Sequence, residues 1–111
     1  VRAVFDYVAT RADLDAGRVG LWGVSLGGYY APRAAAFEKR AKACIALSGP
    51  YDFGDCWDGL PELTRETFRV RARCATQDEA RRHAATLTLK GVAANIDCPL
   101  FIVAGKQDRI V

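Results

Sequence analysis

The stretch that decides the fold is residues 18–28, which read Arg-Val-Gly-Leu-Trp-Gly-Val-Ser-Leu-Gly-Gly. Its first five residues, 18–22, form a short apolar run typical of a buried strand. Residues 26–37 are rich in alanine and predict a helix, in which Pro32 lies beyond the first turn and removes one backbone hydrogen bond. Between strand and helix, residues 23–27 match the pattern G-x-S-x-G. The sequence therefore predicts a strand, a sharp turn that carries Ser25, and a helix.

A serine on such a turn is placed for nucleophilic chemistry. The turn holds the Ser25 hydroxyl clear of the sheet, and we expect strand and helix to approach so closely that Gly23 and Gly27 have no room for side chains. The backbone N–H of Leu26 and the N-terminus of the helix would then lie where an oxyanion develops. The alternative is a tight turn in which Ser25 only caps the helix. The glycine patterns of nucleotide-binding turns, G-x-G-x-x-G and G-K-[ST], are absent.

The remaining chain predicts an alternation of helices and strands. These elements are a helix over 1–8, strands over 43–47 and 99–104, and helices over 65–73 and 78–87, the last opened by a capping box at 76–79. The alternation indicates an α/β fold with a parallel sheet. We expect residues 1–50 and 98–111 to form the sheet core of a single incomplete domain, and residues 51–97 to form a helical insertion. Because three strands with one crossover helix cannot cover both faces of a parallel sheet, we expect an interior fragment of a longer chain.

Asp108 is the candidate acid of a catalytic triad. It follows the third predicted strand, and an acid in the turn after a later strand fits the chain order Ser…Asp…His. Its task would be to orient an imidazole that activates the serine. The alternative is an ordinary loop aspartate. The only histidine, His83, precedes Asp108 in a polar, arginine-rich stretch, so we expect the triad histidine outside this chain.

These motifs resemble the α/β-hydrolase superfamily. The resemblance rests on residues 23–28 after a strand and on the tail 105–111, and it implies that the predicted strands are strands 5, 6 and 7 of the hydrolase sheet. Within the superfamily, residues 27–31, 37–45 and 52–57 are similar to the group that contains 2,6-dihydroxypseudooxynicotine hydrolase and the FrsA-like esterases. The resemblance implies that Ser25 is the nucleophile, that the Leu26 N–H is one oxyanion donor, and that residues 51–97 form a cap over the site.

The same resemblance implies the chemistry. We expect a serine hydrolase that uses a Ser-His-Asp triad to cleave a carboxylic ester, or an activated C–C bond next to a carbonyl, through an acyl-enzyme. An acyltransferase of the same fold and a non-catalytic binding protein remain open alternatives. In the cap, Trp57 and Phe68 are candidates to line the substrate pocket, although such residues more often pack between helices.

The amino-acid composition limits the classes of binding partner that we expect. The 111 residues carry 16 Lys and Arg against 13 Asp and Glu, and this small, scattered excess argues against nucleic acid. No apolar run approaches the roughly 20 residues of a membrane span, and no secretory leader opens the chain. Four dispersed cysteines without a C-x-x-C pair favour free thiols and no metal site. We therefore expect a cytoplasmic enzyme that acts on a small ester or ketone without a cofactor, and a homodimer remains open.

Overall fold

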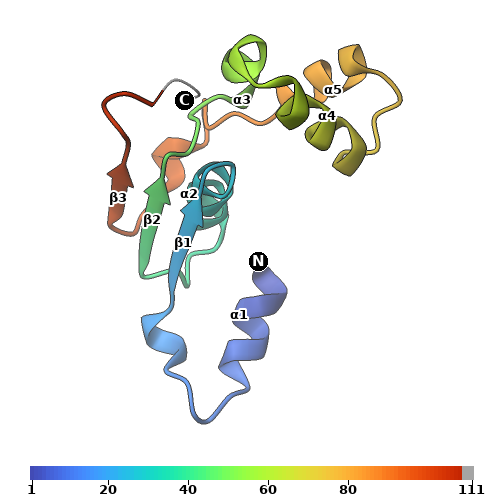
Figure 1. Ribbon diagram of the computed structural model, residues 1–111. Coiled ribbons are helices and arrows are strands. Elements are labelled where there is room, and N and C mark those ends of the chain that lie inside the picture. The colour runs from blue at the N-terminus through green and yellow to red at the C-terminus, as the bar shows by residue number, and fades with distance from the viewer. Residues whose placement is uncertain (109–111) are drawn as a thin grey trace.

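Three parallel strands form the centre of the computed structural model, which describes residues 1–108. The strands are β1 (Gly20–Val24), β2 (Ala43–Leu47) and β3 (Leu100–Val103), and they lie in the order β1-β2-β3 (Figure 1). Their register places Trp22, Ile45 and Phe101 side by side across the sheet. The predicted parallel α/β sheet is therefore confirmed.

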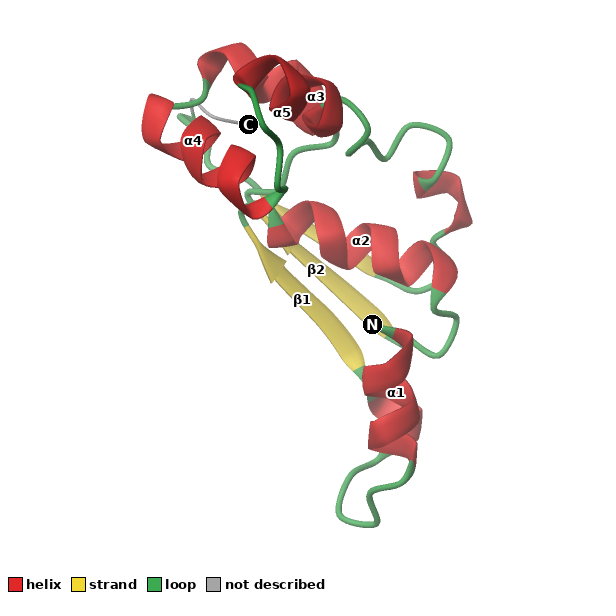
Figure 2. Ribbon diagram, turned by 90° about the vertical axis from the view of Figure 1, so that its right-hand side faces the viewer, coloured by secondary structure: helices red, strands yellow, loops and turns green. Residues whose placement is uncertain are grey.

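One helix covers one face of this sheet. Helix α2 (Gly27–Phe37) lies against β1 and β2 (Figure 2), and its Ala31 and Ala35 pack on Cys44. The other face is left open by the described residues: Trp22 is 73% exposed and Phe101 is 64% exposed. Parallel sheets are normally covered on both faces, whereas this second face is apolar and exposed.

The first strand begins two residues later than the sequence predicts. Helix α1 (Arg2–Ala9) is followed by a short 3-10 helix, η1 (Ala16–Arg18), so Arg18 lies outside β1. The Asp15 carboxylate causes this, because it accepts a hydrogen bond from the Gly17 N–H at 2.9 Å and pairs with the Arg18 guanidinium at 2.7 Å. The strand then extends through Gly23 to Val24.

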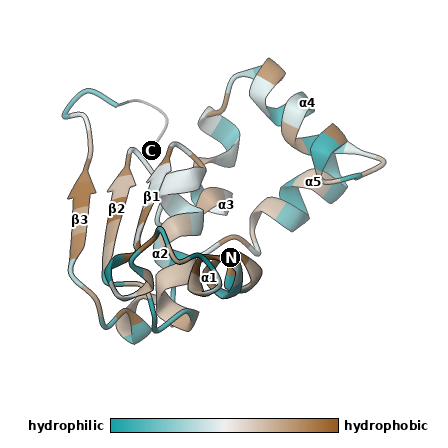
Figure 3. Ribbon diagram, turned by 90° about the horizontal axis from the view of Figure 1, so that it is seen from below, coloured by the Kyte–Doolittle hydropathy of each residue, from teal (hydrophilic) through white to brown (hydrophobic). Residues whose placement is uncertain are grey.

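Four short helices lie beyond the carboxyl ends of the strands, and we call residues 53–84 the helical segment (Figures 1 and 3). They are α3 (Phe53–Cys56), the 3-10 helix η2 (Trp57–Gly59), α4 (Glu62–Arg71) and α5 (Gln77–Ala84). Helices α4 and α5 are the two that the sequence predicts, with bounds shifted toward the N-terminus. The capping box is present: Thr76 Oγ1 accepts from the Glu79 N–H at 3.2 Å, and the Glu79 carboxylate accepts from the Ala75 N–H at 2.7 Å. A last 3-10 helix, η3 (Ala93–Asn95), precedes β3.

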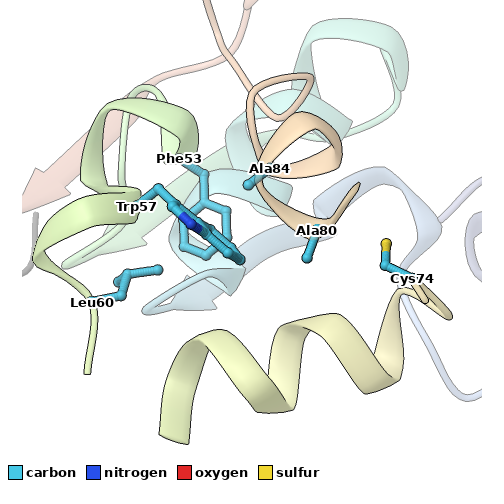
Figure 4. Packing of buried hydrophobic residues seen from close by; sticks show 6 residues of the cluster. All are labelled: Phe53, Trp57, Leu60, Cys74, Ala80 and Ala84. Carbon is cyan, nitrogen blue, oxygen red and sulfur yellow. The ribbon is translucent and has the colours of Figure 1, made fainter. Parts of the chain in front are cut away.

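The helical segment has a hydrophobic core of its own. Figure 4 shows this cluster, which consists of Phe53, Trp57, Leu60, Cys74, Ala80 and Ala84. The Trp57 ring stands at right angles to that of Phe53, with ring centroids 6.3 Å apart. Tight backbone packing joins the ends of the segment, since a Cβ on Gly54 would lie 2.7 Å from the Ala85 Cα. The segment therefore has a hydrophobic cluster of its own, and Leu26 at the start of α2 packs against it.

All four cysteines are free thiols, as the sequence predicts. Burial raises the pKa of the Cys44 thiol to about 11, so it stays protonated and unreactive at neutral pH. No helix within residues 1–108 is long and apolar enough to cross a membrane.

The start of α2 touches the chain after β2 through backbone atoms. A Cβ on Gly28 would lie 2.7 Å from the Gly49 Cα and 3.0 Å from the Leu47 carbonyl oxygen. One on Gly23 would lie 1.8 Å from the Gly27 carbonyl oxygen. The sequence-based prediction that Gly27 has no room for a side chain is wrong, because a Cβ there would meet nothing within 4 Å. The crowded pairs are Gly23 with the Gly27 carbonyl, and Gly28 with Gly49, because α2 presents its backbone rather than a side chain to the sheet.

Substitution by alanine at two neighbouring glycines should therefore change the free energy of unfolding in opposite directions. In the full-length protein, Gly28→Ala should lower the free energy of unfolding by about 2 kcal/mol or more, because backbone atoms must move to admit the methyl group. Gly27→Ala should change it by less than about 1 kcal/mol, in the stabilising direction, since alanine favours the helix and the space is open. Denaturant unfolding of both variants measures this, and equal losses would contradict the contact.

Candidate active site

Ser25 lies in a strained turn between β1 and α2. Its φ is 56°, in the left-handed region that residues other than glycine rarely adopt. Hydrogen bonds on both sides hold the turn: the Ser25 N–H donates to the Leu47 carbonyl at 2.8 Å, and the Gly28 N–H donates to the Ser25 carbonyl at 2.7 Å. The Ser25 residue is exposed. The geometry is that of a serine held up at the end of a strand.

Ser25 does not cap the helix. The N-cap of α2 is Leu26, and no side chain makes a capping hydrogen bond there. The backbone N–H of Leu26 makes no hydrogen bond within the described part of the chain. This N–H lies at the N-terminus of α2, beside the turn. A donor in this position stabilises negative charge. The geometry therefore fits the nucleophile interpretation of Ser25 better than the capping alternative.

Ser25 and Leu26 lie at the base of a pocket of about 630 Å³ under the helical segment. Phe68 lines this pocket. The other lining residues are Tyr30, Pro50, Phe53, Leu60, Leu63, Thr64, Thr67, Arg71, Ala72, His83 and Leu87. Trp57, the second predicted lining residue, is placed elsewhere: it is 4% exposed in the cluster of Figure 4 and lines a smaller pocket on the outer side, with Asp58 and Arg65.

Asp108 ends the described chain, in the turn after β3. Its backbone N–H donates to the Gly105 carbonyl at 3.0 Å, and its side chain is half-buried. Burial raises the pKa of the Cys56 thiol, and the negative charges of Asp55, Asp52 and Asp108 raise it further. Asp108 follows β3 as Ser25 follows β1, so both residues lie beyond the carboxyl ends of parallel strands. The rest of the predicted tail, residues 109–111, lies outside the described residues.

His83 is exposed to solvent and also lines the Ser25 pocket. Its Nδ1 is 3.9 Å from the Cys74 Sγ, and its ring meets the Phe68 ring edge-on, with centroids 5.9 Å apart. A histidine base needs a carboxylate or carbonyl at the nitrogen opposite to the nucleophile, and here that neighbour is a thiol. His83 is therefore a pocket residue that lacks the partner of a triad histidine.

The pocket also contains a tyrosine and two threonines that were not predicted from the sequence. Tyr30, in the first turn of α2, is exposed beside Ser25, while its neighbour Tyr29 is fully buried and burial raises the pKa of its phenol. Thr64, Thr67 and Arg71 come from α4. Their spacing of three and four residues places them on one helix face, and that spacing is the signal in the sequence that would have found them.

The sheet, the turn at Ser25 and the acid after β3 together define a chain of the α/β-hydrolase class. The sequence also matches the family model of the prolyl oligopeptidase family over residues 1–111. The chain belongs to this family. The membership agrees with the superfamily resemblance that the motifs at residues 23–28 and 105–111 indicate.

Particular relatives are hydrolases. The chain is 37% identical over 109 residues to 2,6-dihydropseudooxynicotine hydrolase of Paenarthrobacter nicotinovorans, covering 97% of this chain and 29% of that protein. It is 49% identical over 62 residues to 20-hydroxy-prefusarin hydrolase of Gibberella moniliformis, covering 56% of this chain and 13% of that protein. The crystal structure of 2,6-dihydroxy-pseudo-oxynicotine hydrolase superposes with a TM-score of 0.91 at 36% identity, covering 98% of this chain and 31% of that one. The chain thus spans less than a third of these relatives.

Proposed function

We propose that this chain carries the nucleophile and the acid of a serine hydrolase that forms an acyl-enzyme. The observation that carries the proposal is the placement of Ser25, exposed at a φ of 56° in the base of a 630 Å³ pocket. The relatives with hydrolase names support it at the level of the reaction class. The proposed substrate is a carboxylic ester, or a compound with an activated C–C bond next to a carbonyl.

In the proposed reaction, a base takes the proton of Ser25 Oγ while this oxygen bonds to the substrate carbonyl carbon. The Leu26 N–H donates to the oxygen that becomes negative. The bond to the leaving group then breaks, and the leaving group takes the proton from the base. Water cleaves the acyl-enzyme in the same way, which releases the acid and restores the hydroxyl. Asp108 would orient the base, a histidine outside this chain.

Ser25→Ala should abolish turnover in the full-length protein. We expect the rate of ester hydrolysis to fall by at least about three orders of magnitude, because no other group on the chain replaces the nucleophile. The free energy of unfolding should change by less than about 0.5 kcal/mol, since the exposed hydroxyl makes no capping bond.

Ser48→Ala is the matched control. Ser48 also follows a strand of this sheet with a positive φ, 47°, and its N–H donates to the Val103 carbonyl at 2.7 Å. It does not line the pocket. This variant should keep its turnover. Comparable activity of the two variants would remove Ser25 from the mechanism.

Asp108→Asn should lower kcat by several orders of magnitude and leave the fold intact, because the amide stabilises the wrong tautomer of the base. Asp97→Asn is the control, since Asp97 pairs with Lys39 at 2.6 Å, away from the pocket. Steady-state kinetics with circular dichroism separates the two effects. Near wild-type kcat in Asp108→Asn would place the triad acid elsewhere.

A further inference from the structure

One face of α4 forms the wall of the pocket opposite Ser25. Its lining residues are Leu63, Thr64, Thr67, Phe68, Arg71 and Ala72. Their positions recur with the period of a helix, so they make a continuous stripe. The stripe has an apolar part around Phe68 and a polar row of Thr64, Thr67 and Arg71. The row ends at Arg71, which is also the last residue of α4.

The positive charge of Arg71 is not compensated inside this pocket. Arg69, on the same helix, is paired with Glu66 at 2.6 Å, whereas Arg71 is exposed at the end of α4. Within residues 1–108, Arg71 makes no ion pair or hydrogen bond, and no Asp or Glu lines the pocket. The carboxyl end of α4 supplies only about half a negative charge, which a guanidinium exceeds.

His83 adds a second polar group at the same end of α4. It is fixed there by the edge-on contact with Phe68 and by the approach of Nδ1 to Cys74, which follows α4 directly. Its other nitrogen, Nε2, makes no hydrogen bond in the described part of the chain. The exposed imidazole and guanidinium groups at this end of the wall can together bind oxygen atoms that carry negative charge.

We propose that Arg71 and His83 form an anion subsite, so that the preferred substrates are acyl compounds with an apolar middle and a terminal carboxylate. The apolar middle would lie along Phe53, Phe68 and Leu87, with the reacting carbonyl at Ser25 and the carboxylate at the guanidinium. This inference rests on the proposed function of Ser25. It adds the substrate class, which neither the fold nor the G-x-S-x-G motif determines.

The test compares two series of 4-nitrophenyl esters in the full-length protein. One series comprises the monoesters of straight-chain dicarboxylic acids from succinate to suberate, and the other the monocarboxylic esters of the same chain length. At the best-fitting length, kcat/KM should be at least about tenfold higher for the carboxylate ester, the effect of one charged hydrogen bond. Arg71→Gln should abolish this preference, so that the ratio of kcat/KM between the carboxylate ester and the neutral ester falls to about one.

Arg65→Gln is the matched control. Arg65 lies on the same helix but lines the outer pocket with Asp58, Glu62 and Asp78, so the preference should persist in this variant. Dissociation constants of the same esters for Ser25→Ala protein give a readout that needs no turnover, and they should show the same dependence on Arg71.

The outcomes separate the two proposals. If the parent hydrolyses both series with equal kcat/KM and Ser25→Ala binds both equally, the anion subsite is wrong and the nucleophile stands. If the parent hydrolyses neither series but the carboxylate esters bind about tenfold more tightly only when Arg71 is present, the subsite stands and the proposed reaction is wrong.

Discussion

The contact on which the site depends is between two stretches of backbone. Gly28, at the start of α2, lies against Gly49, just after β2. The two are so close that a Cβ on either glycine would overlap the backbone of the other. Because this contact draws the helix start onto the sheet, the chain between β1 and α2 has only a few residues in which to turn. The turn forces Ser25 into the left-handed region, where its N–H is held by Leu47. The backbone strain at Ser25 is offset by the close contact between Gly28 and Gly49, which only glycine permits.

The second constraint is the direction of the strands. Since β1, β2 and β3 are parallel, their carboxyl ends meet at one edge, and the turns after β1 and β3 carry Ser25 and Asp108 to it. The helical segment lies over this edge with a hydrophobic core of its own. It therefore provides the second wall of the pocket, while Ala31 and Ala35 of α2 pack on Cys44 in the sheet. This division lets the sheet position the reacting groups while α4 and α5 present the residues that contact a substrate.

Most of the core was predictable from the sequence because its signals are local. The apolar run at 43–47 gave β2 with its observed bounds, and the G-x-S-x-G spacing predicted the turn. Two details were not predictable. The start of β1 is set by the Asp15 side chain, and the crowded glycine is Gly28 rather than Gly27, since the crowding comes from a residue 21 positions away. In the helical segment, the sequence does not reveal which aromatic residue lines the pocket. Phe68 lines it, whereas Trp57 is buried in the hydrophobic cluster.

The most direct test of the account is covalent modification of Ser25. A fluorophosphonate probe reacts only with a serine that is activated and exposed, so the full-length protein is treated with it, digested with trypsin and analysed by mass spectrometry. The account predicts one modified peptide, residues 19–33, which contains Ser25. Residues 43–65, which contain the only other serine of this chain, Ser48, should stay unmodified. An unmodified 19–33 peptide from a folded and active protein would contradict the assignment of the nucleophile.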